Sequence, residues 1–294
     1  MSKKFVFGGS FSGAIPLPLL LDLYPSTAGQ YFMHKVSNTY TGACIRVRRS
    51  SDNAEQDIGF VGIDLDTAGL TSFVGASHGL VTTWYSQSGF FNLTQTSANL
   101  QPAIIIGGVL QTLNGKPCLK FDGSNDFLTG GTSANNIVDI DYFFTGIAEL
   151  TTNNRAFWAK SLAAGVSNRI AYIRESQSYF LAAPPAGAQV QLNTGAHTSA
   201  KMYSSSCFWN RILGNPLEYR AYVDDVNIAS DLTNLFVVFP NSFRFLLGAY
   251  NNSNDTGEII HNNGKIQCLA VWTNNQLGNY STINTIINDY YAIY

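Results

Sequence analysis

Carboxylates are the side chains with which this sequence could do hydrolytic chemistry. A glycosidase needs two carboxyl groups that face one sugar, about 5 to 9.5 Å apart. The carboxylates of the strand-rich part are few, namely Asp122, Asp126, Glu175, Glu218, Asp224, Asp225 and Glu258. None has a spacing that we recognise as a catalytic pair, and Asp122, directly before Gly123, is typical of a turn whose side chain caps backbone N–H groups. We therefore predict no catalytic residue.

Three neighbouring arginines, Arg46, Arg48 and Arg49, form a basic cluster that could grip a phosphate or an anionic glycan. The nearby acids Asp52, Glu55, Asp57, Asp64 and Asp66 supply enough negative charge to neutralise all three. We interpret Arg46, Arg48, Arg49, Asp52 and Asp57 as an ion-pair network that holds a long loop. The same acids could ligate calcium, but they lack the spacing of an EF-hand loop. No metal site and no cofactor is predicted, and calcium stays an open alternative.

Glycan binding needs a planar apolar face for the C–H groups of a sugar and nearby amides or carboxylates for its hydroxyls. Two segments combine both kinds of side chain, and their candidate glycan-binding residues are Trp209, Asn210, Tyr250, Asn251, Asn252 and Asp255. A solvated turn is the alternative interpretation of each segment.

Other familiar chemistry finds no support in the sequence. The four histidines stand apart, and there is no nucleotide-binding loop. The cysteines, Cys44, Cys118, Cys207 and Cys268, form no C-x-x-C pair, which argues against a zinc or redox site. Buried free thiols that pack as small hydrophobic groups are the favoured interpretation.

The charge of the chain is low in density and close to balance. Lys and Arg number 17 against 19 Asp and Glu, so the net charge is −2, and only 12% of residues are charged, where about 25% is usual. Without a basic surface the chain is not expected to bind nucleic acid. Weak charge repulsion between surfaces favours a homo-oligomer.

The elements that must position these residues are mainly strands. Short apolar or alternating runs, rich in Tyr and Phe, are separated by turns at roughly the 8–12-residue spacing of a β-sandwich. Asn114–Gly115 predicts a hairpin, and Asp66–Thr67 the N-terminus of a short helix that Gly75 ends. Ile283, Ile286, Ile287 and Tyr290 have helical spacing and predict a terminal helix.

The first residues differ from the rest. Glycines and prolines break residues 1–30, which we expect to be an irregular arm, with a single sandwich domain over 31–294. The apolar stretch from Ala14 to Leu21 has eight residues, whereas about 20 are needed to span a bilayer. We expect neither an export signal nor membrane insertion, and we favour docking of the arm onto a neighbouring subunit.

Two parts of the sequence resemble a known family. The text YTGACIRVRRSSDNAEQDIGF, VTTWYSQSG, QPAII and NGKPCLKFDGSNDFL, and later FRFLLGAYNNSNDTGEIIHNNGKIQCLAVWTNNQL with INDYYAIY, resembles the concanavalin A-like (laminin G-like, lectin/glucanase) domains of phage virion proteins and, distantly, the catalytic module of arabinofuranosidase B. The resemblance implies an all-β fold, a concanavalin A-like jelly-roll β-sandwich with an irregular N-terminal arm and a short C-terminal helix.

The chain departs from this family at one turn. The family text is W-Y-D-Q-S-G, whereas here Ser86 replaces the acid, so no role of that carboxylate carries over. Phe90 and Phe91 follow, and we expect them to pack under a neighbour rather than stack on sugar.

The resemblance and the uncharged surface together favour a non-enzymatic virion structural protein of a phage or virus: a head fibre, a decoration protein or a tail-associated protein. We expect it to contact other virion proteins through the arm, to attach to host-surface polysaccharide, and to leave the cell by lysis as part of the particle. A glycoside hydrolase of the arabinofuranosidase type and a free lectin are the alternatives.

Overall fold

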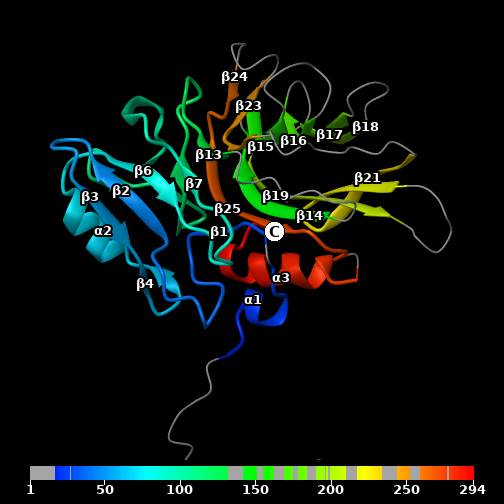
Figure 1. Cartoon of the computed structure of the whole chain (residues 1–294), viewed down its shortest axis with the longest axis horizontal. Coiled ribbons are helices and arrows are strands. Elements are labelled where there is room, and N and C mark those ends of the chain that lie inside the picture. Colours follow the sequence, from blue (N-terminus) through cyan, green and yellow to red (C-terminus); the bar gives the residue numbers. More distant parts are fainter. Residues whose placement is uncertain are drawn as a thin grey trace, which may run out of the picture.

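The computed structural model describes residues 17–26, 28–131, 142–150, 155–161, 169–174, 178–183, 190–195, 197, 199–209, 217–233, 244–251, 259–276 and 278–294. Most of them form antiparallel strands (Figure 1). Together they make a β-sandwich, as the sequence predicts.

Two sheets form the sandwich, and they are joined through β6 (Gly79–Trp84), which pairs with strands of both. The first sheet contains β21 (Val226–Thr233), β20 (Leu217–Val223), β19 (Ala200–Trp209), β14 (Tyr142–Glu149), β25 (Lys265–Trp272), β1 (Gln30–Phe32), β12 (Leu119–Lys120), β8 (Ala103–Ile106), β9 (Val109–Leu110), β2 (Ile45–Arg49) and β3 (Glu55–Ile58). The second sheet contains β18 (Val190–Gly195), β17 (Ser178–Ala183), β16 (Arg169–Arg174), β15 (Arg155–Ser161), β22 (Arg244–Leu247), β13 (Leu128–Gly131) and β7 (Leu93–Thr94).

Three small hairpins extend from these sheets: β4 (Phe60–Val61) with β5 (Asp64–Leu65), β10 (Thr112–Leu113) with β11 (Lys116–Pro117), and β23 (Ala249–Asn251) with β24 (Ile259–His261). The β10–β11 turn confirms the predicted hairpin. Its central residues, Asn114 and Gly115, have positive φ angles of 48° and 74°, which tight hairpin turns require.

The continuous apolar run of β25 is explained by burial on both of its faces. Leu269 and Val271 point into the main core between the two sheets. Cys268, Ala270 and Trp272 alternate with them and pack on the opposite side, under the helices. A strand buried on both faces has no polar side, so it reads as an uninterrupted hydrophobic segment.

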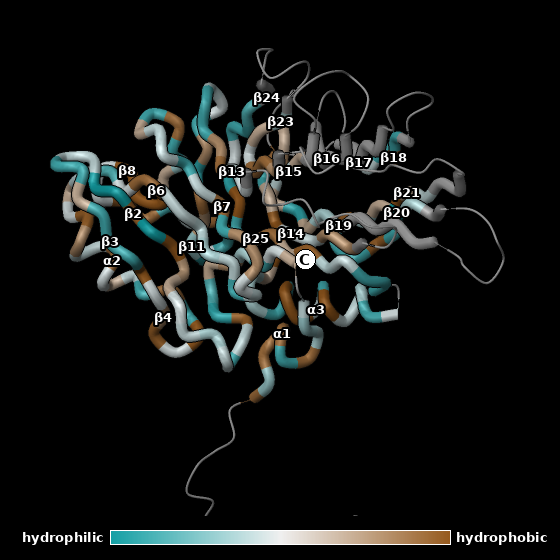
Figure 2. The backbone as a smooth tube through the Cα atoms, in the orientation of Figure 1, coloured by the Kyte–Doolittle hydropathy of each residue, from teal (hydrophilic) through white to brown (hydrophobic). Residues whose placement is uncertain are grey.

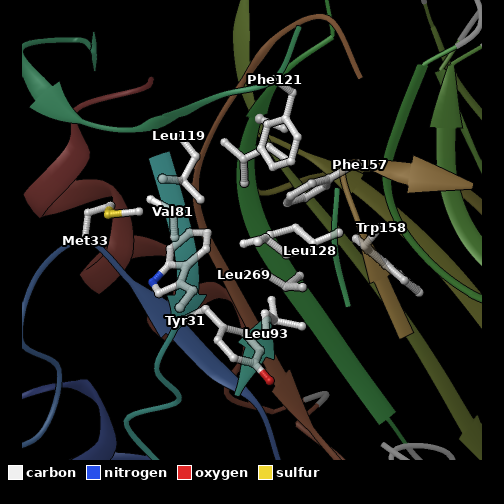
Figure 3. Packing of buried hydrophobic residues seen from close by; sticks show 14 of the residues in the cluster. Tyr31, Met33, Val81, Leu93, Leu119, Phe121, Leu128, Phe157, Trp158 and Leu269 are labelled. Atoms are coloured by element: carbon white, nitrogen blue, oxygen red, sulfur yellow. The ribbon is translucent and has the colours of Figure 1, made fainter. Parts of the chain in front are cut away.

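A β-bulge in β15 concentrates aromatic rings in the main core. The register of β15 against β16 shifts between Ala156 and Trp158, which leaves Phe157 as the extra residue. Phe157 and Trp158 therefore both point into the interior (Figure 3), where Trp158 stacks on Phe144 with ring centroids 4.2 Å apart.

In the described part of the chain, three α-helices accompany the sheets: α1 (Leu20–Leu23), α2 (Thr67–Val74) and α3 (Tyr280–Tyr291), with a 3-10 turn at Ala98–Leu100. The α2 prediction is confirmed, because Asp66 Oδ1 accepts from Gly69 N at 2.8 Å and Gly75 ends the helix. In Figure 1, α1 and α3 lie below β1 and β25.

The terminal helix is the one that the isoleucine spacing predicts. Ile283 and Ile287 are buried against the first sheet, and Leu20 and Leu21 of α1 join the same cluster. Figure 2 shows hydrophobic stretches, coloured brown, on both helices. Thus one helical turn, α1, forms within the segment expected to be irregular, and residues 1–16 of the predicted arm lie outside the described residues.

A buried polar network fixes α3 to the sheet. The amide of Asn284, a fully buried residue, contacts Thr145 Oγ1 at 2.8 Å, Ser204 Oγ at 3.1 Å and Asp225 Oδ1 at 3.0 Å. These groups lie on α3, β14, β19 and the turn after β20, so one side chain ties together four segments.

Replacement of Asn284 by alanine is expected to lower the free energy of unfolding by about 1–3 kcal/mol, because it removes the buried hydrogen bonds of the amide and leaves the hydroxyls of Thr145 and Ser204 with only each other as partners. Chemical denaturation measures this change. The matched control is Thr285→Ala, an exposed position of the same helix, which should stay within about 0.5 kcal/mol of wild type. An equal loss in both variants would contradict the role given to the network.

The turn in which Ser86 replaces the family's acid is structural. Ser86 Oγ accepts from Gln30 N at 3.1 Å, and Gln87 accepts from Val36 N at 2.8 Å and donates to His34 O at 2.7 Å. The turn therefore holds the segment that begins with β1. Phe91, which follows it, is buried in the main core, so the prediction that it packs is confirmed.

Candidate functional site

An open groove lies beside the β4–β5 hairpin. Strand β4 of this hairpin is at the lower left of Figure 1. Its volume is about 390 Å³. The residues that line it are Lys35, Tyr40, Thr41, Gly42, Ala43, Gly59, Phe60 and Gly62. One wall is thus the segment that follows β1, and the other is the beginning of the hairpin.

Backbone hydrogen bonds hold the two walls in register. Lys35 N donates to Ile63 O at 2.8 Å, and His34 forms a β-bridge with Asp64. Asp66 N donates to Gly59 O at 3.0 Å on the hairpin side. The first two contacts bring together segments that are far apart in the sequence, and all three make the groove a fixed part of the fold.

Two aromatic residues that line the groove contact each other. Tyr40 and Phe60 meet edge to face, with centroids 6.5 Å apart and an angle of 73° between the ring planes. Tyr40 Oη donates to Ala43 O at 2.7 Å, which fixes that ring. Gly42 lies under it, because a Cβ at this position would be 2.5 Å from Tyr40 Oη. The glycine is needed for the ring to lie where it does.

The hairpin tip adds apolar surface beside the groove. Val61 and Ile63 are 66% and 45% exposed, and Gly62 between them has a φ of 64°. Figure 2 shows this stretch in brown at β4. The groove therefore combines aromatic and apolar residues with the basic residue Lys35.

The acids near the groove are already engaged. Asp57 accepts from Arg46 Nη2 at 2.6 Å and from Tyr85 Oη at 2.8 Å, and the Arg46 hydrogen bond is the main cause that lowers the pKa of this carboxyl. Asp64 accepts from Tyr290 Oη at 2.6 Å. The Lys35 ammonium, by contrast, makes no hydrogen bond or ion pair within the described part of the chain.

The arginine cluster is an ion-pair network at two of its three members. Arg46 pairs with Asp57 and Arg49 with Asp52, each at 2.6 Å. The prediction is wrong for Arg48. This residue is only 8% exposed and donates to Gln101 Oε1, Asn53 Oδ1 and Ala98 O. Neutral oxygens of the 3-10 turn and its surroundings thus replace the expected acids.

The predicted glycan-binding residues do not form a site in the described part of the chain. Tyr250 is wrong as a sugar platform, because its side chain is only 2% exposed and no ligand could stack on it. Asn210, Asn252 and Asp255, together with the side chains of Trp209 and Asn251, lie outside the described residues. The sequence analysis missed the groove, whose local signals are the pairs Tyr40–Gly42 and Gly59–Phe60.

The turn after β12 contains two acids, Asp122 and Asp126, whose pKa values are shifted in opposite directions. Asp122 Oδ1 accepts from the backbone N of Ser124, Asn125 and Asp126, which confirms the predicted cap and lowers the pKa of Asp122 despite partial burial. Asp126 is only 7% exposed, and burial, reinforced by the nearby Asp122 carboxylate, raises its pKa to about 7. The neighbouring strand β24 lies at the top of Figure 1, away from β4.

Other predicted features can be placed as well. Cys44, Cys118 and Cys268 are buried and free, as expected, and the side chain of Cys207 lies outside the described residues. In the described ranges no three His, Cys, Asp or Glu side chains come together as a set of metal ligands. None of the helices described has the length and apolar character that a membrane span requires.

Comparison with known proteins identifies the fold. No model of a protein family matches the chain, and no curated protein matches it in sequence. A GH54 α-L-arabinofuranosidase soaked with a cyclic sulfate inhibitor is similar in structure, with a TM-score of 0.69 and 13% sequence identity over 92% of this chain. An arabinofuranosidase complexed with arabinofuranosyl-α-1,2-xylobiose gives a TM-score of 0.61 and 14% identity over 91% of this chain.

The chain spans 64% of the length of each of these solved structures. At such low identity the likeness establishes a shared β-sandwich fold, of a type that occurs in carbohydrate-active proteins.

Proposed function

We propose that this chain is a non-enzymatic virion structural protein of a phage, such as a head fibre, decoration or tail-associated protein, that attaches to host-surface polysaccharide through the groove beside β4. The observation that carries the glycan-binding part is the pair of aromatic rings, Tyr40 and Phe60, in an open and rigid groove. Aromatic faces bind the C–H surfaces of sugars, and a fixed ring loses little conformational entropy on binding.

The fold supports this proposal without carrying it. The similar solved structures are named as arabinofuranosidases, and one of them holds an arabinofuranosyl oligosaccharide. Proteins that contain this sandwich can therefore act on or bind sugars, but folds of this kind also serve purely structural roles. Binding in this chain is proposed from its own groove.

Blocking the groove tests the binding site. A Cβ at Gly59 meets open space, with no atom within 4 Å, so Gly59→Leu is expected to fill the groove while the chain stays folded. We expect this variant to bind immobilised host polysaccharide at least about tenfold more weakly than wild type, because the added side chain excludes the sugar.

The matched control is Gly278→Leu, at a glycine that also faces open space but lies between β25 and α3. It should bind like wild type. Thermal denaturation of both variants shows whether they are folded. Undiminished binding by a folded Gly59→Leu chain would contradict the site.

The virion assignment is tested separately. Mass spectrometry of purified particles is expected to detect the chain, and its absence from particles, together with glycan binding by the isolated chain, would favour a free lectin. We also propose that the chain is a homo-oligomer and contacts other virion proteins through residues 1–16 of the predicted arm, because Leu20, Leu21 and Gln30 are buried in the chain's own fold. Sedimentation of the intact chain tests the oligomer, and the incorporation into particles of a chain lacking residues 1–16 tests the contact.

A glycoside hydrolase is the second candidate, and one observation favours it. The pKa of Asp126 is raised to about 7 beside Asp122, whose pKa is lowered, and such a divergence is typical of an acid and a base that share a site. Release of reducing sugar from arabinoxylan that is lost in Asp126→Asn would establish this alternative. We expect no release, because Asp122 caps the turn with three backbone bonds.

A further inference from the structure

We propose that the groove selects sugars that carry an anionic group, a carboxylate or a phosphate, and that the ammonium group of Lys35 binds this group. The inference rests on the proposed function, because it names the class of glycan that the same groove takes. The evidence for it is that Lys35 has no ionic partner in the described part of the chain, whereas the neighbouring carboxylates of Asp57 and Asp64 are already paired.

Lys35 is the cation that remains available at the groove. Its backbone is fixed by the bond to Ile63 O, so the side chain starts from a defined place in the wall. Within the described ranges its ammonium has neither an ion pair nor a hydrogen bond. A lysine that is unpaired in a groove can bind an anion without first breaking an internal contact.

The neighbouring acids do not compete for this cation. Asp57 is held by Arg46 and Tyr85, and Asp64 is held by Tyr290 and lies 3.6 Å from Lys116 Nζ. Both carboxylates are thus compensated by partners other than Lys35. The uncompensated charge at the groove is therefore the positive charge of Lys35, which attracts an anionic sugar.

The groove is poorly equipped for a purely neutral sugar. Recognition of sugar hydroxyls usually needs amides or carboxylates, and among the described residues that line the groove there is no Asn, Gln, Asp or Glu. The Tyr40 hydroxyl donates its proton to Ala43 O, which leaves it only as an acceptor. A charge-assisted bond to Lys35 is therefore the strongest polar contact that the lining offers.

Three ligands distinguish the sources of the anion. We would titrate the intact chain with three ligands. An oligogalacturonate supplies carboxylates, the same oligosaccharide with its carboxyl groups reduced to alcohols is neutral, and an oligosaccharide whose only charge is an added phosphate supplies the phosphate. We expect at least one anionic ligand to bind about tenfold or more tightly than the neutral one, as a charged hydrogen bond requires. Raising the salt concentration should narrow this difference.

Two substitutions at Lys35 complete the experiment. Lys35→Met keeps the linear side chain but removes the charge, and it should weaken binding of the anionic ligand about tenfold while leaving the neutral ligand unchanged. Lys35→Arg keeps the charge and should retain most of the preference. Equal binding of charged and neutral ligands, or an unchanged preference in Lys35→Met, would overturn the inference.

The outcomes separate this inference from the proposed function. Binding that Gly59→Leu abolishes but Lys35→Met leaves untouched means that the groove binds glycans without selecting charge, so the inference alone fails. Binding of the anionic ligand that is lost in Lys35→Met and also in Gly59→Leu supports both. Binding that neither variant alters places the site elsewhere, and both fail together.

Discussion

Replacement of Trp158 by alanine is expected to lower the free energy of unfolding by about 3–5 kcal/mol, the usual cost of removing a large buried aromatic ring. Trp158 is 1% exposed, and its ring lies parallel to that of Phe144 and to that of Phe245, 6.3 Å away.

Equilibrium denaturation with urea or guanidinium measures the loss. The matched control is Val109→Ala, because Val109 lies in a strand but is 64% exposed; it should change stability by less than about 0.5 kcal/mol. A Trp158→Ala chain as stable as this control would mean that the two sheets do not pack through Trp158, and the sandwich core would have to be redrawn.

The stability of the wild-type chain is expected to change little between pH 6.5 and 4.5, because two buried groups act in opposite directions. Burial lowers the pKa of His34 from 6.5 to about 3, and the charge of Lys116 adds to this. Below pH 6.5 the unfolded chain therefore binds a proton at His34, whereas the folded chain does not. The stability of the folded chain falls as the pH drops. Over this range the loss is about 2 kcal/mol.

Asp126 has the opposite effect. Its pKa rises from 3.8 to about 7 in the fold, mainly through burial. The folded chain therefore binds a proton at this carboxyl as the pH falls through 7, whereas the unfolded chain binds it only near pH 3.8. Stability conferred by the protonated form is therefore gained as the pH falls from 7, again by about 2 kcal/mol over the same range. The two contributions nearly cancel in the wild type.

Replacing either His34 or Asp126 reveals the pH dependence that the other residue contributes. In Asp126→Asn the His34 effect stands alone, and stability should fall by about 2 kcal/mol from pH 6.5 to 4.5. In His34→Phe, which keeps a ring stacked on Tyr290 where the histidine ring lies 3.8 Å away, stability should rise over the same range. Denaturation curves at several pH values measure both. Two variants with the same pH dependence would contradict the assignment.

The environment of His34 explains why it resists protonation. Its ring lies between Tyr290 and Tyr291 of α3, with Nδ1 at 3.1 Å from Tyr291 Oη, and Lys116 and Asp64 are the charged groups nearby. Protonation would place a charge among these rings. When His34 becomes protonated at low pH, we expect unfolding to begin with the release of α3 from the sheet. Asp126→Asn makes this loss of stability visible because it removes the opposing effect.

Much of the fold could be predicted from the sequence because its signals are local. The turn at Asn114–Gly115, the cap at Asp66 and the spacing of Ile283 and Ile287 each depend on a few neighbouring residues, and the structure confirms all three. The short helix α1 was not predicted, since its stability comes from contacts with α3 rather than from its four residues.

The groove could not be predicted, because pairing of distant strands creates it. Lys35 and Phe60 come together through the bond from Lys35 N to Ile63 O and the bridge between His34 and Asp64, and no local sequence pattern predicts that register. The error at Tyr250 has a related cause: an aromatic residue next to asparagines resembles a sugar-binding loop, but here the ring is buried at the β23–β24 hairpin. Burial of a single ring depends on tertiary packing.

The position of a bound sugar would decide the account. A crystal structure of the chain with an anionic oligosaccharide is predicted to show a sugar ring in the groove against the Tyr40–Phe60 pair, with its charged group toward the ammonium of Lys35. A sugar bound instead at the Asp122–Asp126 turn, or at the loop of Asn251 and Asp255, with the groove empty, would contradict it.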